Sequence, residues 1–79
     1  MTAYEARYPA GTMVRIASLD RLRTFQQQWK YHHPLDPDQL KYAGTADRVC
    51  GVNFYQGDDA IYNLENAPGT WHEELLDPA

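Results

Sequence analysis

The most constraining feature of this sequence is the run ADRVCGVNFY at residues 46–55, which alternates apolar and polar side chains around a glycine. A period of two is typical of a β-strand, because successive side chains point to opposite faces. The two faces are expected to carry Cys50, Val52 and Phe54 toward the core, and Val49, Asn53 and Tyr55 on the other side. A glycine in mid-strand is typical of a bulge or a sharp bend, so Gly51 predicts one here.

The residues after this run predict that the chain returns as antiparallel strands. Residues 56–59 have the composition of a hairpin loop, and AIYNL at 60–64 follows as a second strand. Pro68 and Gly69 suit the two central positions of a type II turn. A last short strand is expected at 70–72, followed by one helical turn.

The first third of the chain predicts a strand and then a helix. TMVRIAS at 12–18 alternates like a strand, with Val14 and Ile16 on one face. Ser18 suits a helix N-cap. The side chains that follow form an apolar stripe at helical spacing: Leu19, Leu22, Phe25 and Trp29. We expect a helix from about 19 to 30; an extended, irregular excursion over the same residues is the alternative.

Prolines govern the connection that follows. Pro34 and Pro37 exclude a long helix or a strand from HHPLDPDQL. Asp36 is expected to cap a single helical turn that begins at Pro37. Leu40 would then face the core.

Together these elements predict a mainly β fold: a small SH3-like five-stranded barrel with one helix or long loop inserted after the first strand. Residues 11–79 would form this single domain, and residues 1–10 an N-terminal arm that Tyr4 and Tyr8 could anchor. A single cysteine excludes an internal disulfide, so aromatic burial or self-association must stabilise so small a core. Trp71 is expected to fill hydrophobic space there.

Three short motifs point to known families: Gly11-x-x-Val14-Arg15-Ile16, Tyr31-His32-His33-Pro34, and Trp71-His72-Glu73-Glu74-Leu75-Leu76-Asp77-Pro78-Ala79. The first and last resemble the SH3-like barrel of nitrile hydratase beta subunits. The middle one is similar to a segment of the ferredoxin-thioredoxin reductase variable chain, another small SH3-like barrel. The resemblance implies an accessory chain that docks on a catalytic subunit and supplies no metal or cluster ligands. The helix-like segment 19–30 is not part of either family's pattern.

The charge distribution argues against nucleic acid as a partner. The net charge is −4, and residues 35–79 carry nine acids against two basic residues. A nucleic-acid binder normally has a basic stripe. The nearest equivalent is the set Arg15, Arg21, Arg23 and Lys30, which reads more simply as a solvated helix face.

Composition also bears on membranes, cofactors and location. No stretch approaches the roughly 20 apolar residues that cross a bilayer, so no membrane partner is expected. The start MTAYEARYPAG lacks a signal-peptide pattern, and a free thiol fits a reducing cytoplasm. His32, His33, His72 and Cys50 are the residues with ligand chemistry. Adjacent histidines usually point apart, so neither a metal nor another cofactor is expected.

Trp71-His72-Glu73 raises the question of acid–base catalysis. Neighbours on a strand point to opposite faces, so an inward Trp71 would place His72 outward, as an exposed histidine beside carboxylates. No nucleophile motif or phosphate loop is present. No catalytic residue is therefore expected, and a non-enzymatic role is favoured over an enzymatic one.

Acids and aromatic residues instead predict a docking face for a protein partner, such as a catalytic subunit. Acids cluster by sequence at the hairpin and the final turn, where they could steer a basic partner, and tyrosine and tryptophan are favoured interface anchors. The expected partner-binding residues are Tyr42, Tyr55, Asp58, Asp59, Tyr62, Trp71, His72 and Glu73. The alternative is a homo-oligomeric barrel that binds a small ligand, or is enzymatic, at a site shared between subunits around Trp71, His72 and Tyr62.

Overall fold

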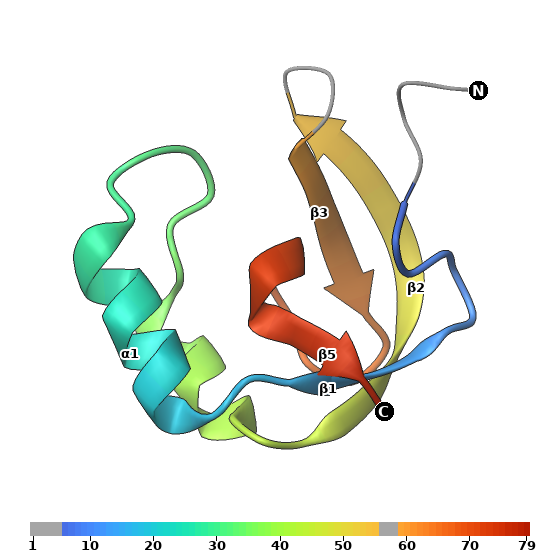
Figure 1. Ribbon diagram of the computed structural model, residues 1–79, viewed down its shortest axis with the longest axis horizontal. Helices are drawn as coiled ribbons and strands as arrows, with labels where there is room; N and C mark the ends of the chain where they lie inside the picture. Colours follow the sequence, from blue (N-terminus) through green and yellow to red (C-terminus); the bar gives the residue numbers. More distant parts are fainter. Residues whose placement is uncertain (1–5, 56–58) are drawn as a thin grey trace.

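The computed structural model describes residues 6–55 and 59–79, which form five β-strands, one α-helix and two 3-10 turns. In chain order the elements are β1 (Met13–Ile16), α1 (Leu19–Gln28), η1 (Pro37–Tyr42), β2 (Ala46–Tyr55), β3 (Asp59–Leu64), β4 (Trp71–His72), η2 (Glu73–Leu75) and β5 (Leu76–Pro78). The helix and η1 lie on one side of the strands (Figure 1). The predicted mainly β fold is confirmed. Tyr4 and most of the predicted hairpin loop lie outside the described residues.

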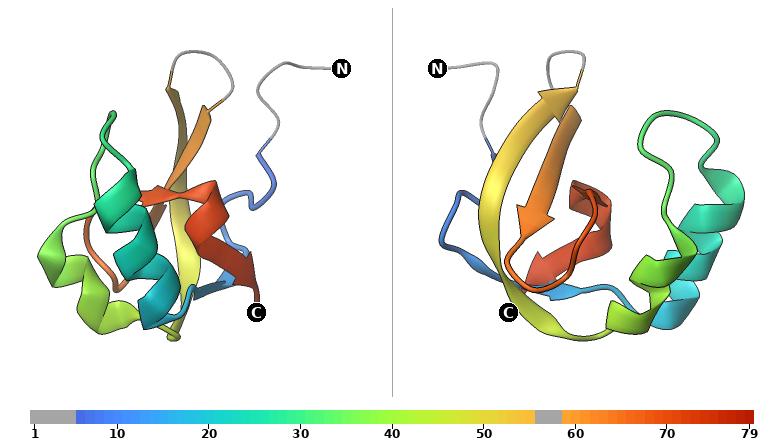
Figure 2. Two further views of the ribbon diagram at one scale, coloured as in Figure 1. Left: turned by 60° about the vertical axis from the view of Figure 1, so that its left-hand side comes forward. Right: turned by 180° about the vertical axis from the view of Figure 1, so that it is seen from behind.

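The strands form one antiparallel sheet in the order β4-β3-β2-β1-β5. Strand β1 lies between β2 and β5, so the last strand of the chain pairs with the first. The long strand β2 curves through the molecule, pairing with β1 by its first residues and with β3 by the remainder (Figure 2). Within the described ranges no pairing joins β4 to β5, and the sheet is not closed into a barrel.

Strand β5 was not predicted. The helical turn expected at 73–76 is present as η2, but the chain then extends and pairs with β1, placing Leu76 opposite Ile16. A hydrogen bond from the Ala17 N–H to the Leu75 carbonyl at 2.8 Å continues the contact. Three residues are too few for alternation to be recognised in sequence, so only the pairing reveals this strand.

The bend predicted at Gly51 is present as a register shift between Val49 and Gly51 in the pairing of β2 with β3. Val49 is buried before the shift, and Val52 and Phe54 pack against the same core after it. Cys50 lies at the shift and is exposed, so the prediction that its thiol faces the core was wrong. The physical reason is that an extra residue at a bulge changes which side chains face inward.

Helix α1 begins where the sequence predicts, which excludes the alternative of an irregular excursion. The Ser18 hydroxyl caps it by accepting a hydrogen bond from the Arg21 N–H at 3.3 Å. Leu22 and Phe25 are buried, as the apolar stripe predicts, whereas Leu19 is 38% exposed. The helix therefore presents a narrower apolar face to the sheet than expected.

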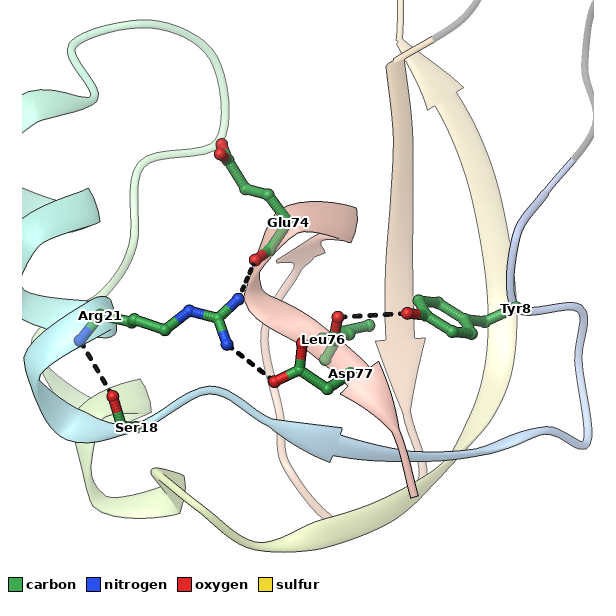
Figure 3. Close-up of polar contacts among 6 residues, drawn as sticks. All are labelled: Tyr8, Ser18, Arg21, Glu74, Leu76 and Asp77. Atoms are coloured by element: carbon green, nitrogen blue, oxygen red, sulfur yellow. Dashed lines mark hydrogen bonds and ion pairs between the residues drawn. The ribbon is translucent and has the colours of Figure 1, made fainter.

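A polar contact fastens α1 to the C-terminal elements (Figure 3). The Arg21 guanidinium donates to the Asp77 carboxylate at 2.7 Å and to the Glu74 carbonyl oxygen at 2.6 Å. The charged side chains are about half exposed, so the ion pair itself stabilises the fold by only about 0–1 kcal/mol. Its geometry nevertheless fixes where η2 and β5 lie against the helix.

The turn η1 has the predicted cap. The Asp36 carboxylate accepts from the Asp38 N–H at 3.0 Å, and the Gln39 side chain accepts from the Asp36 N–H, forming a capping box. Gln39 also donates to the Thr70 carbonyl at 3.0 Å and packs against Gly69, whose φ is +101°. This buried glutamine joins the first half of the chain to the turn before β4.

The core is built around fully buried rings. Trp71 is 0% exposed, and its indole N–H donates to the Ala67 carbonyl at 3.1 Å, so the prediction that it fills hydrophobic space is confirmed. Tyr8 is also buried, and its hydroxyl donates to the Leu76 carbonyl at 3.2 Å (Figure 3). Tyr8 thus anchors the N-terminal segment against β5, as expected.

Asp47 is a buried carboxylate on β2. It accepts hydrogen bonds from the backbone N–H groups of Arg48, Asn66 and Ala67 and from the Asn66 amide, at 2.8 to 3.0 Å. Burial alone raises the pKa of this carboxyl, but the four hydrogen bonds favour the ionised form and lower the pKa below 3.8. The carboxylate therefore holds the turn after β3 onto β2.

None of the described residues forms a helix of the length and apolar character needed to span a membrane.

Candidate functional site

The candidate site is a cluster of rings where the segment after α1 meets β2, β3 and β4. We define the histidine cluster as His32, His33, Tyr55, Asp59 and His72. These residues come from three strands and one loop, which folding brings together. The loop extends beyond the C-terminal end of α1 (Figure 1).

Trp29 builds the loop that carries the two adjacent histidines. The Trp29 ring stacks on Phe25 with centroids 5.2 Å apart, which fixes it against α1. Its indole N–H donates to the His32 carbonyl at 2.7 Å and closes a tight turn. His33 then adopts a φ of +50°, a left-handed conformation uncommon for residues other than glycine. The backbone thus turns the two imidazole rings toward one another.

His32 is the centre of the cluster. Its Nε2 lies 2.5 Å from the Asp59 carboxylate, and its Nδ1 lies 2.8 Å from Nδ1 of His33. Its ring stacks on Tyr55 with centroids 3.9 Å apart and an interplanar angle of 15°. The imidazole is mostly buried, whereas the Asp59 side chain is 42% exposed. A carboxylate and two imidazoles are therefore joined in one hydrogen-bonded chain that reaches solvent.

His72 is the buried member of the cluster and holds the backbone of the loop. It is 3% exposed, and its Nε2–H donates to the His33 carbonyl at 2.8 Å. Its ring contacts Phe25 and Trp29, with centroids 4.8 and 5.0 Å away. Burial lowers the pKa of His72 below 6.5; the bond to the His33 carbonyl opposes this shift, and the neighbouring His32 adds to it. His72 is therefore held as neutral imidazole.

The prediction that His72 is exposed was wrong. Trp71 pairs with Tyr62 and His72 with Ile61, so the two side chains of β4 do point to opposite faces. The error lay in taking the second face to be solvent, because Phe25 of α1 and Trp29 cover it. Alternation identified the faces correctly but could not show what covers each of them.

Two more of the expected partner-binding residues are buried. Tyr62 and Trp71 are both 0% exposed, so neither side chain reaches the surface on which the docking face was expected. The Tyr62 hydroxyl donates to the Glu73 carboxylate at 2.6 Å and accepts from the Tyr8 N–H at 3.3 Å. Burial, followed by the bond to Glu73, raises the pKa of Tyr62 to about 12. The large rings are needed to fill the small core, which sequence alone did not decide.

The other five expected partner-binding residues, where described, lie in different parts of the structure. Tyr55 and Asp59 belong to the histidine cluster. Tyr42 is half-buried at the end of η1, where Lys41 lies over its ring at 5.4 Å. Glu73 is half-buried and bonded to Tyr62, and Asp58 lies outside the described residues. The structure therefore brings three of the eight predicted site residues, Tyr55, Asp59 and His72, together with the two loop histidines.

Four residues of this site were not among the expected partner-binding residues: Trp29, Tyr31, His32 and His33. Tyr31 is 72% exposed and meets Trp29 edge to face, with centroids 5.0 Å apart. The sequence signals were the Tyr31-His32-His33-Pro34 motif, the ligand chemistry of its two histidines, and their place just after a predicted helix. Nothing in the sequence links Asp59 to His32, because that contact depends on how the sheet curves.

Chemically, the cluster offers imidazole nitrogens and one carboxylate as hydrogen-bonding groups. Among residues 6–55 and 59–79, no three His, Cys, Asp or Glu side chains are arranged to hold a metal ion. His72 turns its Nε2 to a backbone carbonyl, and His32 uses both ring nitrogens within the cluster. The arrangement is that of a partly exposed aromatic surface held by hydrogen bonds.

A separate groove of about 330 Å³ lies between α1 and η2. It is lined by Asp20, Arg21, Thr24, Phe25, Gln28, Glu74 and Leu75, and most of the surface they expose there is apolar. The Arg21 side chain is engaged with η2 and β5 here. The groove lies where α1 meets η2, and its lining residue Phe25 also packs against Trp29 and His72 at the candidate site.

Comparison with protein-family models found no match. Comparisons with curated proteins and with solved structures found no match either.

Proposed function

We propose that this chain is a non-catalytic interaction module of the SH3-like kind, with the sheet left open between β4 and β5 in the described residues, and that it docks on a protein partner such as a catalytic subunit. The sheet order, with the last strand returning to pair with the first, supports this family of folds. So does the 3-10 turn between β4 and β5. Each is consistent with the resemblance carried by the short motifs at the two ends of the chain.

The observation that carries the proposal is the exposure of Tyr31 beside an ordered set of rings. Tyr31 leaves 72% of its surface in water while resting against Trp29. Trp29 is in turn held by Phe25 and by the His32 carbonyl. An exposed aromatic side chain on a rigid support is typical of an interface anchor, because little side-chain freedom is lost on binding.

The chemistry around Tyr31 indicates the kind of partner. Asp59, nearly half exposed, supplies a carboxylate at the edge of the histidine cluster, and Tyr55 supplies a second ring. The chain as a whole carries a net charge of −4. A partner surface with a basic residue next to an apolar pocket would be complementary, since opposite potentials accelerate association.

The alternative of a site shared between subunits around Trp71, His72 and Tyr62 has less support. All three side chains are buried within a single chain. Their hydrogen bonds are made to groups of the same chain. A shared cavity would require the core to open.

The proposal is tested by affinity capture from cells that produce the protein, comparing three chains. Wild type and the control Met13→Ala should recover one partner in stoichiometric amount. Met13 is the matched control because it is another exposed large side chain, 42% exposed on β1. Tyr31→Ala should reduce recovery at least about 10-fold, the loss expected for an interface anchor. Equal recovery by Tyr31→Ala and Met13→Ala, or no stoichiometric partner, would contradict the proposal.

A further inference from the structure

We propose that His32 and His33 form a proton-operated clasp, which holds the loop after α1 against Tyr55 and Asp59 and releases it in acid. The inference goes beyond the proposed function, because it concerns the chain alone and needs no partner. Histidine is the residue whose charge ordinarily changes between about pH 5 and 8. The clasp is carried by the geometry of the two rings.

The first step is to count the protons that the contacts allow. An ionised carboxylate only accepts hydrogen bonds, so the 2.5 Å contact with Asp59 requires a proton on Nε2 of His32. The 2.8 Å contact between the two Nδ1 atoms requires one donor and one acceptor. At most one of these Nδ1 atoms can therefore carry a proton.

The contacts thus survive one added proton but not two. With both imidazoles neutral, His33 donates from Nδ1 to His32. With one added proton, either ring can be the cation, and one Nδ1 still accepts. When both rings are cations, both Nδ1 atoms carry hydrogens that point at each other across 2.8 Å. Like charges at this distance repel, so the second proton opens the contact.

The surroundings favour this order of events. The groups that face the pair from neighbouring elements are Asp59 on β3, Tyr55 on β2 and His72 on β4, with Glu74 of η2 acting on His72. The Asp59 carboxylate stabilises the first positive charge. The ring of His72 lies 5.3 Å from that of His32 and 6.5 Å from that of His33, and is held neutral by burial. Any charge that His72 gained in acid would oppose the second proton further.

The backbone conformation of His33 favours release of the loop once the Nδ1 contact is lost. His33 is held at a φ of +50°, a strained conformation that persists only where contacts enforce it. The enforcing contacts are the bond from His72 to the His33 carbonyl, the bond from Trp29 to the His32 carbonyl, and the Nδ1 contact. Loss of the Nδ1 contact lets His33 return to an ordinary φ. The loop then leaves Tyr55.

The test is an NMR titration of the full chain from pH 7.5 to pH 5. The ring protons of His32 lie over Tyr55 at pH 7.5, so they should show a ring-current shift and a nuclear Overhauser effect to the Tyr55 ring. Both should disappear as the second proton binds, and the Trp29 indole N–H should shift with them. Amide signals of β2 and β3 report that the sheet stays folded. Persistence of the His32–Tyr55 contact at pH 5 would overturn the proposal.

Three variants distinguish release of the loop by the histidine pair from a general loss of stability in acid. His33→Asn tolerates the left-handed φ but cannot take up the second proton, so the His32–Tyr55 contact should persist to pH 5. Asp59→Asn removes the charge that holds the first proton, which should change the midpoint of release by at least about 3-fold in proton concentration. Asp77→Asn, an acid bonded to Arg21 instead, is the matched control and should behave like wild type.

The outcomes decide the proposal in each case. Release of His33→Asn at the wild-type midpoint would overturn it. Should His33→Asn lack the ring contact already at pH 7.5, the Asp59→Asn midpoint decides, and a midpoint equal to that of Asp77→Asn would also overturn the clasp.

Discussion

Nε2 of His72 lies 2.8 Å from the carbonyl oxygen of His33, which joins the short strand β4 to a loop 39 residues earlier in the chain. The bond ties the loop after α1 to strand β4, two segments that the sequence did not link. It requires a hydrogen on Nε2 of His72, whose pKa burial lowers below 6.5. The loop, the helix and the sheet are thereby coupled through one imidazole.

His72 predicts a loss of stability in mild acid. Burial lowers its pKa in the folded chain below the 6.5 of the unfolded chain. The contribution of neutral His72 is therefore complete above about pH 6.5 and decreases as the pH falls below it. Urea unfolding at pH 7.5 and 5.5 should show a smaller decrease in free energy of unfolding for His72→Gln, which keeps a donor but does not titrate. An equal decrease in both chains would contradict this.

Removing the buried Asp47 carboxylate should strongly lower the free energy of unfolding. Asp47→Ala leaves the N–H groups of Arg48, Asn66 and Ala67 without their acceptor, which should lower the free energy of unfolding by about 2–4 kcal/mol. Since the pKa of Asp47 is lowered below 3.8, its contribution should persist until the pH falls below about 4. Chemical denaturation measures both effects. Glu65→Ala, an exposed acid next to the same turn, should change stability by less than about 0.5 kcal/mol.

Tyr62 predicts instability in strong alkali. Its pKa is raised to about 12 by burial and by the Glu73 carboxylate, whereas the unfolded side chain titrates near 10. The stabilisation is therefore complete below pH 10 and is lost as the pH rises from 10 through 12. Tyr62→Phe should lose about 1 kcal/mol at neutral pH with its two hydrogen bonds, and should lack the part of the alkaline loss due to this phenol. Phenolate absorbance and thermal unfolding across this range measure it; identical alkaline curves would be contrary to expectation.

A side chain at position 69 should destabilise the fold. The φ of Gly69 is +101°, and an added Cβ would lie 2.9 Å from the Gln39 amide nitrogen. Gly69→Ala should therefore destabilise the chain by about 1–3 kcal/mol through backbone strain and displacement of Gln39. Gly51→Ala is the control, because an added Cβ there would meet Asn63 at an ordinary 3.7 Å. Thermal denaturation compares them, and similar melting temperatures would refute the assignment.

Local signals in the sequence predicted the local structure well. The caps at Ser18 and Asp36 and the bend at Gly51 each depend on residues close in the chain, and each is present. Burial of Val14 and Ile16 followed from strand alternation. Trp71 fills the core, as its place near the end of a small β-rich chain suggested.

Features that depend on distant pairing were not predicted. Strand β5 exists because Leu76 meets Ile16, 60 residues earlier. Cys50 faces solvent because of the bulge, and His72 is buried because α1 folds over it. The candidate site depends entirely on such contacts, since His32 and Asp59 meet only after the sheet has curved.

The most direct test of the docking face is site-specific photo-cross-linking in cells that produce the protein. A photoreactive phenylalanine analogue in place of Tyr31 should give one dominant cross-linked protein, while the same analogue in place of the exposed Met13 should give none. Failure of the Tyr31 position to cross-link, or the same product from both positions, would contradict the assignment of this surface as the docking face.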